Sequence, residues 1–194
     1  MRNVPERLRS RRLKFEEAGE EGFTLIELLV VLLIIGILLA IAIPTFLSVT
    51  KTANNTAAQA NLQTALTGAD TFYTANNQTY SGLMGVPTLS GITAIDTGLT
   101  YYSGATASTK ANQISLYYNG LRGFAVLAAY APGTKDCWVV VDQKAAQGSA
   151  VFTGVPTATG TYYTVEKAPL PTAGCAANAI TTASTPSSTG FPSG

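Results

Sequence analysis

One apolar stretch near the N-terminus limits what this chain can fold into. From Phe23 to Ile43 the sequence contains a single charged residue, Glu27, and the stretch stops at Pro44. As a helix it would be about 31 Å long, which matches a bilayer hydrocarbon core of about 30 Å. The sequence therefore predicts a helix that can cross a membrane once.

Glu27 is the unusual member of this stretch. A charged side chain in hydrocarbon costs about 2.5–3.5 kcal/mol at the centre of a helix, and less near its end. We therefore expect Glu27 to have a cationic partner. A plain signal-anchor helix, in which the carboxylate reaches back to the headgroup region, is the alternative.

The residues before the stretch are unlike those of a cleaved secretory signal. In such a signal a shorter apolar region follows the basic residues directly, whereas here four glutamates between positions 16 and 21 separate the two. Cleavage after Ala42 is therefore disfavoured. For the same reason Arg11-Arg12 fits a basic leader better than a twin-arginine export signal.

The sequence around position 22 resembles the class III signal of type IV pilins and their pseudopilin relatives. It reads GFTLIELLVV over residues 22–31 and GILLAIAIP over residues 36–44. In that family a membrane-embedded prepilin peptidase cuts after the glycine and usually N-methylates the new first residue. The resemblance implies a leader peptide at residues 1–22 and processing between Gly22 and Phe23. The acidic pair Glu20-Glu21 is similar to the Gram-positive variant of the signal.

The resemblance also gives Glu27 a role. Cleavage would create an α-amine on Phe23, and such an amine is mostly protonated at neutral pH. The carboxylate of Glu27 can pair with the amine of its own chain or with that of a neighbouring subunit. The resemblance favours the neighbour, so Phe23 and Glu27 are the predicted subunit-assembly residues.

The helical pattern continues beyond Pro44. Apolar residues recur there at three- and four-residue steps, as on an amphipathic helix: Leu62, Leu66, Ala69, Phe72 and Tyr73. We expect a transmembrane and polymerisation half-helix at 23–44 and an amphipathic half-helix at 45–80, with a kink from Gly36 and Pro44. So long a helix exceeds what a small globule can enclose, and its first half must pack against lipid or against other subunits.

The rest of the chain predicts a small head. Residues up to 109 are rich in Gly, Ser and Thr and are expected to be irregular. Alternating apolar runs then predict strands at 113–118, 123–130, 137–141 and 162–165, the first two joined by a two-residue turn at Asn119-Gly120. The predicted fold class is α+β: a long N-terminal helix packed on a small antiparallel sheet, with a pilin-like head at 81–180 and a flexible Ser/Thr/Pro tail at 181–194.

The two cysteines, Cys137 and Cys175, form the candidate disulfide. An exported chain in an oxidising compartment can pair them, and pilins often carry such a loop near the C-terminus. Two unpaired thiols are the alternative.

Several kinds of chemistry are excluded by composition. The chain has no histidine, so it lacks the commonest general base and metal ligand, and it has no phosphate-binding loop motif. We expect no enzyme activity, no catalytic residue, no cofactor and no metal site. The scattered positions of Lys110, Arg122, Lys135 and Lys144 argue against nucleic acid as a direct ligand.

The resemblance implies a structural function. It predicts a single-pass membrane protein that becomes part of an extracellular fibre used for adhesion, twitching or DNA uptake. The implied partners are identical subunits, prepilin peptidase, an assembly ATPase with its platform membrane protein, and the lipid bilayer before assembly. The alternative is a pseudopilin of a type II secretion system, or a minor or competence pilin. A major pseudopilin commonly has an acidic calcium-binding loop, whereas here only Glu166 lies beyond Asp142.

Overall fold

The computed structural model describes residues 22–85, 91–167, 174–180 and 184–192. The chain divides into two compact units, Met1–Thr45 and Phe46–Gly194, which are described separately here. The predicted leader, residues 1–22, lies outside the described residues except for Gly22.

The first unit contains the apolar half of helix α2 (Leu25–Ala75). From Phe23 to Ile43 the large apolar side chains are 44–86% exposed, so no part of the described protein covers them. Among the described helices, α2 is the one long and apolar enough to cross a membrane. The helix continues through Gly36 and Pro44 without a break, and a kink at these residues stays a prediction.

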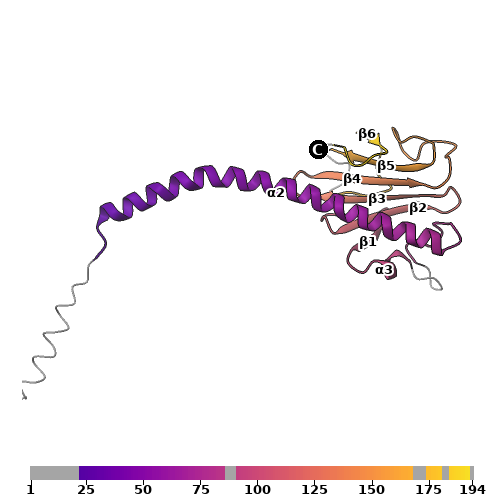
Figure 1. Ribbon diagram of the computed structural model, residues 1–194, viewed down its shortest axis with the longest axis horizontal. Coiled ribbons are helices and arrows are strands. Elements are labelled where there is room, and N and C mark those ends of the chain that lie inside the picture. The colour runs from indigo at the N-terminus through magenta and orange to yellow at the C-terminus, as the bar shows by residue number, and fades with distance from the viewer. Residues whose placement is uncertain (1–21, 86–90, 168–173, 181–183, 193–194) are drawn as a thin grey trace, which may run out of the picture. The chain divides into compact units, whose positions relative to one another are not determined.

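The second unit is built on a six-stranded sheet whose strands follow chain order. The strands are β1 (Thr100–Ser103), β2 (Gln113–Asn119), β3 (Phe124–Ala131), β4 (Asp136–Gln143), β5 (Gly160–Glu166) and β6 (Ser184–Ser187). All neighbours pair antiparallel except β1 and β2, which are parallel. The part of α2 that belongs to this unit crosses one face of the sheet (Figure 1). The α+β fold predicted from the sequence is confirmed.

The first layer of the core lies between α2 and the sheet. Helix residues such as Leu62, Leu66 and Phe72 pack in one cluster with the sheet residues Leu127 and Trp138. This face of the helix carries the three- and four-residue spacing seen in the sequence, which explains why it is the buried face.

A second apolar layer covers the opposite face of the sheet. Val126, Val139 and Val141 pack there with residues from the segments after β4 and after β5, including Val155 and Ile180. Because both faces are covered, all eight residues of β4 are buried. Cys137 and Cys175 form a disulfide in this layer, with their Cα atoms 5.3 Å apart.

The first hairpin differs from its prediction. The prediction of a two-residue turn at Asn119-Gly120 is wrong. Asn119 pairs with Phe124, and the loop between these two residues has four residues. The Oδ1 atom of Asn119 accepts a hydrogen bond from the backbone N–H of Arg122 (2.9 Å), and Gly123 takes a positive φ of 65°. These two features stabilise a longer loop than the Asn-Gly pair alone predicts.

Two segments contain more regular structure than expected. The region predicted to be irregular contains the short helix α3 (Ile92–Ile95) and strand β1. In the segment predicted to be a flexible tail, β6 pairs with β5 and the ring of Phe191 packs edge-on against Trp138, with 5.7 Å between centroids. Strand β1 contains two tyrosines but is only four residues long and lies among Gly, Ser and Thr, and β6 contains Ser, Thr and Pro, so neither edge strand has a clear sequence signal.

The disulfide should contribute strongly to the stability of the head. Replacing both cysteines by Ala (Cys137→Ala, Cys175→Ala) removes a cross-link across a sequence separation of 38 residues. The loop-entropy estimate for such a loop is about 4 kcal/mol. We expect a matching fall in the free energy of unfolding, measured by urea titration of the full chain in detergent, and an unchanged urea midpoint would contradict the expectation.

Candidate functional site

The predicted processing site lies just before the helix. Gly22, Phe23 and Thr24 precede α2 and have no regular secondary structure, and the side chain of Phe23 is 83% exposed. The peptide bond between Gly22 and Phe23 is therefore outside the hydrogen-bonded helix. This position leaves its backbone accessible to a peptidase.

Glu27 makes local hydrogen bonds in this structure. Its Oε2 atom accepts from the backbone N–H and from the hydroxyl of Thr24, both at 2.8 Å, and its own N–H donates to the Thr24 hydroxyl at 3.3 Å. This reciprocal pattern is a capping box, in which Thr24 is the N-cap residue and Glu27 satisfies a donor at the start of the helix. In the uncleaved chain, the carboxylate of Glu27 therefore has neutral hydrogen-bond donors, the N–H and the hydroxyl of Thr24.

Thr24 is not among the predicted site residues. The Thr-x-x-Glu spacing before an apolar run is itself a capping-box signal, so the sequence contains the information needed to find it. The structure places Thr24 and Glu27 next to Phe23, whereas Cys137 and Cys175 lie in the second unit.

A comparison with protein-family models identifies this segment. The model described as the prokaryotic N-terminal methylation motif matches residues 18–43. The chain carries the type IV prepilin signal. This motif supports a precursor of the type IV pilin or pseudopilin kind, processed by prepilin peptidase and anchored in the membrane by its apolar helix.

The prepilin match covers the N-terminal segment alone. No curated protein and no solved structure matches the chain. The match says nothing of the head, and the assignment of the Glu20-Glu21 form to Gram-positive bacteria stays a prediction.

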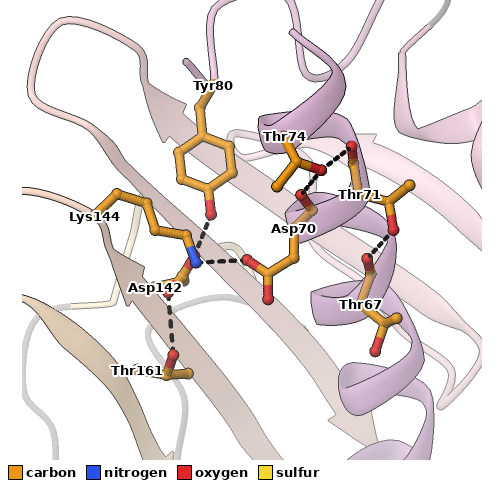
Figure 2. Close-up of polar contacts among 8 residues, drawn as sticks. All are labelled: Thr67, Asp70, Thr71, Thr74, Tyr80, Asp142, Lys144 and Thr161. Carbon is orange, nitrogen blue, oxygen red and sulfur yellow. Dashed lines mark hydrogen bonds and ion pairs between the residues drawn. The ribbon is translucent and has the colours of Figure 1, made fainter. Parts of the chain in front are cut away.

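The head contains a cluster of charged groups that joins α2 to the sheet. Lys144 follows β4, and its Nζ atom lies 2.7 Å from Oδ1 of Asp70 on α2 and 3.0 Å from Oδ2 of Asp142 on β4. The hydroxyl of Tyr80 donates to the same oxygen of Asp142, and Thr161 on β5 donates to its other oxygen at 3.1 Å. Figure 2 shows the Lys144 nitrogen between the two carboxylates. No sequence pattern predicts this cluster, because its members meet only in the folded head.

Burial sets the ionisation of these groups. The Asp142 side chain is 2% exposed, and this burial raises its pKa despite the hydrogen bonds from Tyr80 and Lys144. Burial alone would lower the pKa of Lys144, but its hydrogen bonds to Asp70 and Asp142 and their charges outweigh burial and raise it. Burial and the neighbouring Asp142 also raise the pKa of the Tyr80 hydroxyl. The cluster places the amine of Lys144 between the carboxyl groups of Asp70 and Asp142.

The described residues contain no group of three or more His, Cys, Asp or Glu side chains that could hold a metal ion. The lysine occupies the place between Asp70 and Asp142 where a cation would otherwise be needed. The cluster therefore connects α2 to strand β4.

The exposed face of the second half of α2 is rich in threonine and alanine, although Lys51 and Gln63 are exposed there too. Its threonines donate their hydroxyl groups to the carbonyl four residues earlier, as seen for Thr71 and Thr74 in Figure 2. The same bond occurs at Thr52, Thr56, Thr64 and Thr67. Because these hydroxyls are already bonded, the face can be buried against another surface without leaving them unsatisfied.

The capping box can be tested at Thr24. We expect Thr24→Ala to weaken the first turn of α2 by about 1 kcal/mol and Thr24→Ser to keep it, because serine caps as threonine does. Amide hydrogen exchange of Leu25–Leu28 in bicelles measures the effect. Equal exchange in the two variants would contradict a cap at this position.

The charge cluster predicts a pH-dependent stability. At neutral pH, Lys144→Met leaves two carboxylates without their cation, and we expect a loss of about 2–4 kcal/mol, less than for a wholly buried pair because Asp70 is 43% exposed. Burial in the folded head raises the pKa of Asp142 above its ordinary value, so protonation of the Asp142 carboxyl group favours the folded state. The deficit should therefore shrink as the pH falls through that raised pKa and grow as the pH rises.

Urea unfolding of the full chain in detergent across a series of pH values measures this deficit. Lys144→Arg is the matched control, because it keeps the positive charge and should lose less stability. A deficit that is the same at every pH would contradict the predicted ionisation.

Proposed function

We propose that this chain is a structural subunit of a type IV pilus and has no enzymatic activity. Prepilin peptidase cleaves it after Gly22 and N-methylates Phe23, and an assembly ATPase with its platform membrane protein moves the mature subunit from the bilayer into an extracellular fibre. The observation that carries the proposal is the exposed apolar half of α2, which lies within the segment that matches the prepilin signal.

The half-helix needs an apolar cover both before and after assembly. Its side chains from Phe23 to Ile43 are uncovered, and burying such surface is favourable by roughly 25 cal/mol per Å². Lipid covers them before assembly, and the same half-helices of other subunits cover them in the fibre. The exposed threonines and alanines of α2 from Thr52 to Ala60 are compatible with the same close packing.

Glu27 selects where the subunits join. In the fibre its carboxylate pairs with the α-amine of Phe23 on a neighbouring subunit, exchanging the neutral donors of Thr24 for a full positive charge. An ion pair in low-dielectric surroundings is stronger than the same pair in water. The alternative function, a pseudopilin of a type II secretion system, uses the same signal, and a disulfide-bounded C-terminal segment favours the pilin.

The role of Glu27 has a direct test. We expect Glu27→Ala and Glu27→Gln to leave membrane insertion and leader cleavage intact but to lower the yield of sheared surface fibres at least about tenfold, because an ion pair worth more than about 1.4 kcal/mol is lost. Electron microscopy and quantitative immunoblotting of sheared fractions measure the yield.

Glu27→Gln separates the two roles of the side chain. Glutamine can replace glutamate in a capping box, so this variant keeps the cap and removes the charge. Normal fibres from Glu27→Gln would show that the cap alone is sufficient and would overturn the ion pair. Secretion of a protein substrate without surface fibres in the wild type would instead support the pseudopilin alternative.

A further inference from the structure

The exposed apolar surface of α2 continues beyond Pro44 into the second unit. Three large apolar side chains there are more than half exposed: Phe46, Leu47 and Val49. The hydroxyl of Thr50 donates to the carbonyl of Phe46 at 2.8 Å, so it has a partner without water. The first charged residue after Glu27 is Lys51. The part of α2 that suits an apolar environment therefore ends just before Lys51.

This apolar part of the helix is longer than a bilayer core is thick. From Phe23 to Val49 it measures about 40 Å, whereas the hydrocarbon core measures about 30 Å. A span of this kind tilts or extends its last residues into the headgroup layer. In a membrane we therefore expect Val49 and Lys51 at the headgroups on the side of the head.

A turn of the sheet meets α2 at the same point. Gly133, between β3 and β4, lies so close to the helix that a Cβ atom on it would be 2.8 Å from the Cα atom of Lys51. The next residue, Thr134, donates its hydroxyl to Oδ1 of Asn55 at 2.8 Å. The turn is therefore held beside the end of the apolar part of α2, and Lys135 in this turn is exposed.

The register of the sheet brings two more lysines to this end of the head. Ala131 at the end of β3 pairs with Asp136 at the start of β4, and β2 begins and β5 ends beside them. Lys110 precedes β2, and Lys167 follows β5. We call this end of the head the lysine edge, after its four exposed lysines: Lys51, Lys110, Lys135 and Lys167.

The acidic groups of the lysine edge do not cancel its positive charge. Asp136 is buried and accepts an ion pair from Lys167, with 3.3 Å between Oδ2 and Nζ. Glu166 is partly buried, and burial raises its pKa. The ion pairs of the described residues involve Lys144 and Lys167, so the other three lysines of the edge keep their charge unpaired there.

The remaining charged groups of the head lie farther from Lys51. Asp70 pairs with Lys144 beyond the other end of β4, and Arg122 lies in the loop between β2 and β3. Asp96 packs beside Gly68, about 25 Å farther along α2 than Lys51. The lysine edge is therefore the positive end of the head, although its lysines are scattered in the sequence.

We propose that the lysine edge binds the anionic phosphate headgroups of the bilayer that holds α2, so that the head rests on the membrane surface. The aliphatic stem of a lysine can lie along apolar surface while its ammonium group reaches a phosphate. Apolar burial and attraction to anionic lipids together hold such a surface at an interface. The proposal needs the membrane anchor and no fibre, so it applies equally to a pilin and to a pseudopilin.

Nucleic acid is the competing polyanion. The exposed apolar side chains of Phe46 and Val49 lie next to Lys51 on the same helix. A headgroup layer accepts apolar and cationic groups side by side, whereas the phosphate backbone of a duplex pairs with the cationic groups alone. The apolar neighbours therefore favour the bilayer.

The fluorescence of Trp138 tests the proposal. It is the single tryptophan of the chain, and its ring lies 5.8 Å from Nζ of Lys167 at the lysine edge. The full chain is inserted into vesicles of phosphatidylcholine, with or without phosphatidylglycerol, that contain the same small share of lipid spin-labelled at the headgroup. We expect quenching by the spin label to be at least about twofold stronger in the anionic vesicles and to fall to the neutral value in high salt.

Two kinds of variant identify the groups responsible. The triple variant Lys51→Gln, Lys110→Gln and Lys135→Gln keeps the ion pair of Lys167 and should be quenched equally in both vesicles. As single variants, Lys135→Gln and Arg122→Gln each remove one positive charge, from the lysine edge and from the opposite end of the head. Only Lys135→Gln should weaken the effect of the anionic lipid. An unchanged emission maximum of Trp138 shows that the head of each variant is folded.

Four results would overturn the proposal. Equal quenching of the wild type in the two vesicles would show that anionic headgroups do not attract the head. A full effect of anionic lipid in the triple variant would assign the attraction to other groups. A duplex DNA fragment that the chain shifts in a native gel, with no effect of anionic lipid on quenching, would assign the lysines to nucleic acid. Release of the chain from the vesicles by alkaline carbonate would remove the membrane anchor itself. The assay contains no assembly machinery, so its outcome is independent of fibre formation.

Discussion

The apolar side chains of the first half of α2 have to be covered, and the described protein does not cover them. From Phe23 to Ile43 they are exposed around the whole helix, so the chain needs either lipid or other protein around this segment. The match to the prepilin signal, at residues 18–43, includes this segment. The proposed fibre would meet the same requirement as a membrane, because other subunits would cover the segment in the fibre and lipid would cover it before assembly.

The head solves the corresponding problem within the chain. Its sheet is covered by α2 on one face and by the disulfide-bonded C-terminal segment on the other. Polar side chains of α2 also contact the sheet, as Asn55 does at Trp138 and Asp70 at Lys144.

The sequence predicts those features that depend on local patterns. The helical period from Leu62 to Phe72 and the strands of the central sheet follow from residue spacing, and the prepilin signal follows from a resemblance to a known motif. The edge strands β1 and β6 have four residues each and no clear pattern, because the two tyrosines of β1 lie among Gly, Ser and Thr and β6 contains Ser, Thr and Pro. Both acquire strand geometry from the neighbouring strands.

The two parts of the site differ in the same way. Thr24 and Glu27 are three residues apart, so their capping box can be read from the sequence. Asp70 and Lys144 meet only in the folded head, and nothing in their local sequence predicts the pair.

The N-terminal residue of the mature protein, determined by mass spectrometry of the purified membrane or fibre fraction, tests the central claim most directly. The account predicts Phe23, with or without one added methyl group, and a mature chain that begins at Met1 or at Ile43 would contradict it.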